Sequence, residues 1–296
     1  NKYAWFKIHR SSNEIVEETP NNRMVGFPYT KYMNSIMRVN QSAALVITSA
    51  KKARELGIPE SKWIFMHGGG CLNDIWNITD RLNLHSSPAI KKCSQAIFNA
   101  ANCTQADISF FDLYSCFPSA VQIARKEIGI PDEDNRDLTV TGGLPYYGGP
   151  GSAYVVNSIA SMVSKLRENP GKLGMVTANG WFLTKHGAGV FSSNPFLGEW
   201  NQVIDSSHLQ KEIENSDHPE FIEEANGKGL IETYTVVNSR EGPTKAIIIG
   251  LLEDGKRFVA NTEKDENLLN KMMQNEMLNT KGTVRFENSR NIFQPD

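Results

Sequence analysis

The sequence has few cysteines, almost no net charge and no long apolar run. Its four cysteines in 296 residues include no Cys-x-x-Cys spacing. This argues against a disulfide framework or a zinc site and predicts reduced thiols in an intracellular, cytoplasmic protein. A net charge of −2 argues against a general nucleic-acid or membrane-surface partner. No apolar run approaches the roughly 20 residues of a transmembrane helix. We therefore expect no metal, no nucleic-acid partner and no membrane partner.

What is present is an ordinary globular composition, 40% apolar and 22% charged. Short apolar runs predict buried strands, and longer stretches with apolar residues at i, i+4 and i+7 predict helices. The predicted strands are residues 42–49, 63–66, 108–113, 173–177 and 189–192, and the predicted helices are residues 50–56, 88–102, 117–128 and 155–166. This alternation predicts an α/β fold built around a layered sheet.

The apolar period changes to two from residue 229 onward, which is typical of strands. Strands are predicted at residues 230–237, 245–252, 256–260 and 283–286, with a helix over residues 263–278. Glu253-Asp254-Gly255 predicts a hairpin turn. The domain prediction is residues 1–40 as the tail of a region that lies outside the chain, 41–198 as the α/β domain, 199–226 as a linker, and 227–296 as a small β-rich domain.

Three loops with site-building residues follow predicted strands. They are Asp112-Leu113-Tyr114-Ser115-Cys116-Phe117, the glycine- and proline-rich stretch from Thr141 to Tyr154, and Thr177-Ala178-Asn179-Gly180 with Thr184-Lys185-His186-Gly187. Glycine and proline at this density exclude a helix interior. A loop that leads into a helix presents free N–H groups, which bind anions. Because sites in α/β sheets form from loops at strand ends, we expect these three loops to build one site.

The three loops resemble those of the thiolase superfamily over residues 32–194. Tyr114-Ser115-Cys116-Phe117 takes the place of that family's Asn-Glu-Ala-Phe or His-Asp-Cys-Phe loop, Gly148-Gly149-Pro150 that of Gly-His-Pro, and Ala178-Asn179-Gly180 that of Cys-x-Gly. Residues 22–33 and the β-rich tail are similar to the type 1 thiolase-like proteins. The resemblance implies the C-terminal half of the thiolase fold, a mixed sheet with helices on both faces, followed by an additional OB-like domain.

The resemblance also implies a function in lipid metabolism, as an acyl-CoA acyltransferase of the acetyl-CoA acetyltransferase kind. Coenzyme A thioester is then the substrate or ligand, and no cofactor is permanently bound. The nucleophilic cysteine belongs to the N-terminal thiolase half, in the same polypeptide or a companion chain. The type 1 proteins are expected to be monomers, with a dimer as the alternative.

Two positions depart from the family pattern. Gly149 replaces the histidine that activates the nucleophile, and glycine has no side chain to act as a base. Ala178 replaces the cysteine that shuttles a proton. Two functions therefore stay open, namely an acyltransferase with an atypical site and an acyl-CoA-binding protein without turnover.

Each candidate residue has a catalytic and a structural interpretation. Cys116 is either a proton-transfer group or a small residue at a strand–helix junction. His186 either replaces the missing histidine or is structural. Asn179 and the backbone N–H of Gly180 are candidates for an oxyanion hole, and Tyr114 either donates a hydrogen bond to a thioester or lines a wall. The remaining loop positions assigned to the site are Ser115, Gly148, Gly149 and Ala178.

Overall fold

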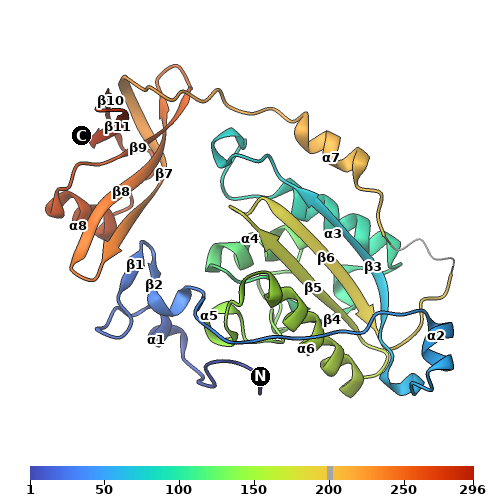
Figure 1. The fold of residues 1–296 in the computed structure, drawn as a ribbon. Coiled ribbons are helices and arrows are strands. Elements are labelled where there is room, and N and C mark those ends of the chain that lie inside the picture. Colours follow the sequence, from blue (N-terminus) through green and yellow to red (C-terminus); the bar gives the residue numbers. More distant parts are fainter. Residues whose placement is uncertain (199–202) are drawn as a thin grey trace. The chain divides into compact units, whose positions relative to one another are not determined.

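The computed structural model describes residues 1–198 and 203–296, which form two compact units (Figure 1). Unit 1 comprises residues 1–9, 35–76 and 85–216, and unit 2 comprises residues 10–34, 77–84 and 217–296. Each unit is therefore assembled from segments that are far apart in the sequence.

The described part of unit 1 is built on a four-stranded mixed sheet in the order β3-β6-β5-β4. The strands are β3 (Phe65–Asn73), β4 (Ile108–Asp112), β5 (Leu173–Gly180) and β6 (Lys185–Ser192). Strand β4 is parallel to β5, whereas β6 is antiparallel to both β5 and β3. A parallel pair requires a long crossover, and the chain between β4 and β5 contains the glycine-rich loop.

Helices cover both faces of this sheet (Figure 1). The helices of unit 1 are α2 (Ala50–Glu55), α3 (Pro88–Ala100), α4 (Pro118–Ile128), α5 (Leu144–Tyr147), α6 (Tyr154–Glu168) and α7 (Ser207–Glu214). Met175 of β5 is fully buried with residues of α3 and α4. Its neighbour Val176 points to the opposite face and packs with Met162 and Leu166 of α6.

Unit 2 contains a closed barrel of five strands within its described residues. These are β7 (Gly227–Ser239), β8 (Gly242–Leu252), β9 (Arg257–Asn261), β10 (Lys281–Glu287) and β11 (Arg290–Pro295), with α8 (Glu266–Gln274) between β9 and β10. The order is β7-β8-β9-β11-β10, β10 pairs back with β7, and β9 and β11 are parallel. A five-stranded barrel of this kind is the OB architecture.

The earlier part of the chain also contributes to unit 2. Residues 10–34 form α1 (Ser12–Val16), β1 (Met24–Gly26) and β2 (Tyr29–Thr30). Strand β1 extends the sheet of the barrel by pairing with β7. Arg257 binds Glu232 through two hydrogen bonds of 2.6 and 2.7 Å and donates to the carbonyl oxygens of Thr79 and Arg81. This buried guanidinium therefore ties residues 77–84 to the barrel.

The α/β class with an OB-like second unit is confirmed, but two sequence predictions were wrong in detail and several elements were not predicted, among them α1, β1 and β2. Residues 42–49 form no strand, and Val46 and Ile47 are 85% and 94% exposed. An apolar run becomes a strand only when a neighbour pairs with its backbone, and no described strand does so here. The third loop is mostly strand, because β5 continues to Gly180 and β6 begins at Lys185. Strand β11 was not predicted. Within residues 1–198 and 203–296, no helix has the length and apolar character needed to cross a membrane.

Candidate functional site

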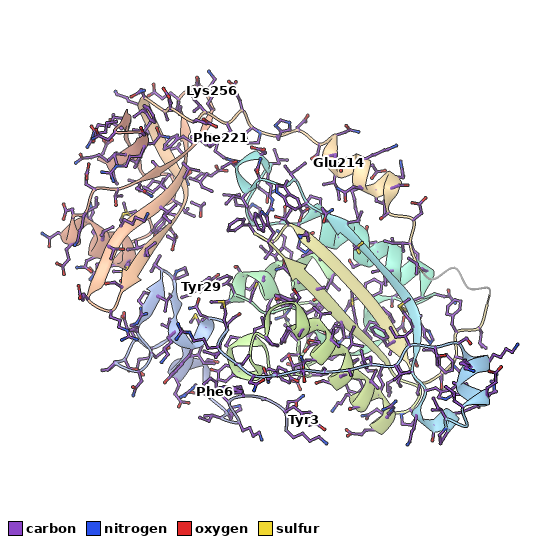
Figure 2. The ribbon with its side chains drawn as sticks, in the orientation of Figure 1. Tyr3, Phe6, Tyr29, Glu214, Phe221 and Lys256 are labelled. Carbon is purple, nitrogen blue, oxygen red and sulfur yellow. The ribbon has the colours of Figure 1, made fainter. Side chains whose placement is uncertain are left out.

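The glycine-rich loop of unit 1 is held between two segments from the start of the chain. The backbone N–H groups of Trp5 and Phe6 donate to the carbonyl oxygens of Tyr147 and Tyr146 at 2.9 Å. From the other segment, the Gln41 amide donates to the Tyr147 carbonyl at 2.7 Å. Tyr3 and Phe6 of the first segment are labelled in Figure 2. Sequence reasoning placed both segments outside the site.

Gly148 and Gly149, at the end of this loop, meet different surroundings. Gly148 has φ +114° and ψ 149°, a backbone conformation that is nearly restricted to glycine. A Cβ atom at this position would overlap the Oε1 atom of Gln41. At Gly149 the nearest atoms to an added Cβ lie at 3.5 Å, and its N–H donates to the Ile36 carbonyl at 2.8 Å. Only Gly148 therefore requires glycine on steric grounds.

Cys116 lies in the loop between β4 and α4 and is partly buried. The Asn179 Nδ2 atom lies 3.6 Å from the Cys116 sulfur and donates a hydrogen bond to it. The hydroxyl of Ser35 donates to the Cys116 carbonyl at 3.1 Å. Burial raises the pKa of the Cys116 thiol, and hydrogen bonds from nearby backbone N–H groups and from Asn179 oppose this rise. At neutral pH the group is therefore a thiol that can donate a proton, rather than a ready nucleophile.

Tyr114 and Ser115 connect the Cys116 loop to the two other loops. The Tyr114 N–H donates to the Thr177 hydroxyl of β5 at 2.8 Å. The Ser115 hydroxyl accepts a 3.0 Å hydrogen bond from the Leu144 N–H of the glycine-rich loop. Burial first, and the nearby Cys116 second, raise the pKa of Tyr114. Its phenol therefore remains a neutral hydrogen-bond donor over the physiological range.

Asn179 and His186 face each other across the β5–β6 hairpin. Together with Tyr114 they line a small cavity of about 20 Å³, which has room for about one water molecule. The Asn179 Oδ1 atom is buried and has no hydrogen-bond partner among the described residues. Asn179 thus reaches the Cys116 sulfur with one end of its amide and leaves the other end available.

His186 is only 6% exposed and is held by a buried polar cluster. Its Nε2 atom lies 3.1 Å from the Asp74 carboxylate and 3.1 Å from the Leu183 carbonyl. Two acceptors at one nitrogen assign that nitrogen as an N–H donor. The Ser87 hydroxyl, at the N-cap of α3, donates to the same Asp74 oxygen. Within the described residues, no hydrogen bond joins His186 to Cys116.

The remaining predicted positions, Ala178 and Gly180, lie inside the β5–β6 ladder. Ala178 is opposite Gly187, and Gly180 is opposite Lys185. The Gly180 carbonyl accepts the Thr184 N–H at 3.2 Å, which closes the turn. In the part of the chain that the structure describes, no group of three or more His, Cys, Asp or Glu side chains is arranged to hold a metal ion.

Sequence reasoning missed Ser35, Gln41, Asp74 and Ser87, and it assigned no role to the side chain of Asp112. Asp112 is fully buried at the end of β4, where it binds the start of the glycine-rich loop. A signal existed for Asp112 alone, because a charged residue that ends an apolar strand must find partners when it is buried. Nothing in the local sequence identifies the other four.

The mixed sheet with its three loops, and the closed barrel that follows it in the sequence, are the elements expected of a thiolase-like fold with an added domain. Residues 208–289 match the family described as the thiolase-like protein type 1 additional C-terminal domain. The crystal structure of a monomeric SCP2-thiolase-like protein type 1 from Mycobacterium smegmatis is similar to this chain, with a TM-score of 0.88 and 32% identity. The similarity covers 100% of this chain and 64% of that chain. No match was found among curated protein sequences. The resemblance to type 1 thiolase-like proteins is therefore confirmed.

Proposed function

We propose that this chain acts in acyl transfer from coenzyme A thioesters, as part of a thiolase-like protein with altered catalytic loops. The observation that supports this most directly is the contact between the Cys116 sulfur and the Asn179 amide, where two of the loops meet. The acyl group would be carried by a nucleophile of the N-terminal thiolase half. The assembly proposed is a monomer, as the similar Mycobacterium smegmatis protein is described to be.

In this proposal Cys116 is the proton-transfer group. A thiol with a raised pKa holds its proton at neutral pH and can deliver it to a developing carbanion or leaving group. The Asn179 amide, which already donates to the sulfur, stabilises the thiolate that remains. The Tyr114 phenol is a neutral donor for the thioester oxygen.

A second function, binding of acyl-CoA without turnover, is favoured because the candidate positions for a general base provide none beside Cys116. His186 is buried against Asp74 and Leu183 and has no bond to Cys116 among the described residues. Gly149 and Ala178 have no titratable side chain. The two functions share a ligand and differ in whether the thioester bond is broken.

The test is to assay the full-length protein for acyl transfer and thioester hydrolysis with acetyl-CoA and longer acyl-CoA thioesters. Intact-mass measurement would detect an acyl group on a cysteine. Cys116→Ala is compared with Cys103→Ala, a partly buried cysteine outside the proposed site. Loss of a general acid should lower turnover by about 100-fold or more, whereas the Cys103 variant should retain it.

Three outcomes overturn the acyltransferase proposal in whole or in part. If wild-type protein binds acyl-CoA but turns none over, the binding function replaces it. If turnover occurs and is equal in both variants, the role of Cys116 is wrong. Absence of both binding and turnover rejects both functions.

A further inference from the structure

Asp112 places a buried carboxylate behind the candidate site. It is 0% exposed at the last position of β4, shortly before Cys116. Four donors from residues 139–141, where the chain enters the glycine-rich loop, converge on its Oδ1 atom. These are the Thr139 hydroxyl at 2.7 Å, the Val140 N–H at 2.9 Å, the Thr141 N–H at 3.1 Å and the Thr141 hydroxyl at 2.9 Å.

The carboxylate has no other compensation among the described residues. Within the described residues, its Oδ2 atom is buried without a hydrogen-bond partner, and Asp112 forms no ion pair with a Lys or Arg. A buried anion is costly unless it is well hydrogen-bonded, and hydrogen bonds to a charged acceptor are about twice as strong as neutral ones. The four donors of residues 139–141 therefore carry the stabilisation of this charge and are in turn fixed by it.

The same residues fix the loop that carries Cys116. Directly after Asp112, the Leu113 N–H donates to the Leu138 carbonyl at 2.9 Å. Further along, Ser115 accepts the Leu144 N–H. The Thr141 hydroxyl also lies 2.8 Å from the Tyr154 hydroxyl, which joins the network to the start of α6. The Cys116 loop and the glycine-rich loop are thus bound together along their length, with Asp112 as the only charged group at the junction within the described residues.

We propose that Asp112 is a positioning residue, whose carboxylate locks the two loops together and thereby holds Cys116 in its partly buried place beside Asn179. The inference rests on the proposed function only in taking Cys116 as the functional group. Its test needs no acyl-CoA, so that failure of the acyltransferase proposal and failure of this one are distinguishable.

The experiment measures the alkylation rate of each cysteine by iodoacetamide against pH, located by mass spectrometry in the folded chain. Asp112→Asn keeps the shape and the accepting oxygen but removes the charge. Thr139→Val removes one donor and leaves Asp112 intact. The matched control is Asp134→Asn, which breaks the Asp134–Arg136 pair elsewhere in the segment between α4 and the glycine-rich loop. Cys103 serves as an internal reference within the same protein.

Release of the Cys116 loop exposes the thiol, and exposure returns its pKa toward the ordinary value. Asp112→Asn should therefore move the pH midpoint of Cys116 alkylation downward and make the reaction at pH 7.5 about tenfold faster. Thr139→Val should act in the same direction with a smaller shift. Asp134→Asn should leave the Cys116 profile unchanged, whatever its effect on the melting temperature.

The proposal is overturned if Asp112→Asn and Thr139→Val lower the melting temperature while the Cys116 profile stays that of the wild type. It is also overturned if Asp134→Asn shifts the profile as much as Asp112→Asn. If Asp112→Asn does not fold, the Thr139→Val profile decides between the same two results.

Discussion

Replacing each of the adjacent glycines, Gly148 and Gly149, with alanine tests how the glycine-rich loop is held. Gly148 has φ +114° and sits against the Gln41 side chain, whereas an added Cβ at Gly149 meets its neighbours at 3.5 Å. A methyl group added at Gly148 should therefore lower the stability of the fold much more than one added at Gly149. The pair needs no assumption about function.

The cost at Gly148 has two parts. Forcing alanine into this backbone region costs about 1–3 kcal/mol. The new Cβ also displaces the Gln41 amide, which donates to the Tyr147 and Tyr3 carbonyl oxygens at 2.7 and 3.1 Å. Each such hydrogen bond contributes about 0.5–1.5 kcal/mol. The sum is about 2–6 kcal/mol for Gly148→Ala, against a change within about 1 kcal/mol for Gly149→Ala.

The assay is thermal unfolding of both variants beside the wild type, followed by hydrogen exchange of residues 139–149. At roughly 2–4 °C per kcal/mol for a domain of this size, Gly148→Ala should melt about 4–24 °C lower and Gly149→Ala within a few degrees of wild type. Gln41→Ala combined with Gly148→Ala isolates the backbone part, since the overlap is gone. Equal melting temperatures for the two single variants would refute the reasoning.

Two further predictions concern other parts of the chain. Arg257→Met leaves Glu232 without its partner and releases residues 77–84, so the free energy of unfolding should fall by about 3–5 kcal/mol and hydrogen exchange in that segment should become faster. Arg290→Met, at an exposed position, is the control. Unchanged hydrogen exchange in residues 77–84 would contradict this prediction. Burial, and then nearby Asp107, raise the pKa of Cys103 from 9.0 to about 11, so the folded state keeps a proton that the unfolded state loses. The stability of the folded state should therefore fall as pH rises from about 9 to 11. Over that range the melting temperature of Cys103→Ala should fall less than that of the wild type. Equal falls in the two proteins would contradict the raised pKa of Cys103.

Elements whose ends are determined by nearby residues could be predicted from the sequence. Helix α4 ends where Gly129 adopts φ +83°, and the Glu253-Asp254-Gly255 turn joins β8 to β9. Both follow from the backbone freedom of a single glycine. The order of the three loops along the chain could also be predicted, because glycine and proline favour turns in most sequence contexts.

Partners that are distant in the sequence could not be predicted. His186 is an obvious candidate base in the sequence, but Asp74, directly after β3, and Ser87, at the N-cap of α3, hold it in a structural cluster. Residues 42–49 have the composition of a buried strand, and only the sheet around them shows that no described strand pairs there. The local sequence limits the secondary structures that a segment can adopt, and contacts with distant residues determine which of them forms.

Unit 2 is assembled from segments that are far apart in the sequence, and this affects how the chain folds during synthesis. The Thr235 hydroxyl donates to the Phe27 carbonyl at 2.8 Å across 208 positions of sequence. At about 5–20 residues per second, a ribosome needs roughly 10–40 s to synthesise that interval. During this time the segment of residues 10–34 waits outside the ribosome without the barrel strand it pairs with. A nascent chain of this protein should therefore be a client of chaperones, and its barrel cannot be excised as a continuous piece without leaving β1 behind.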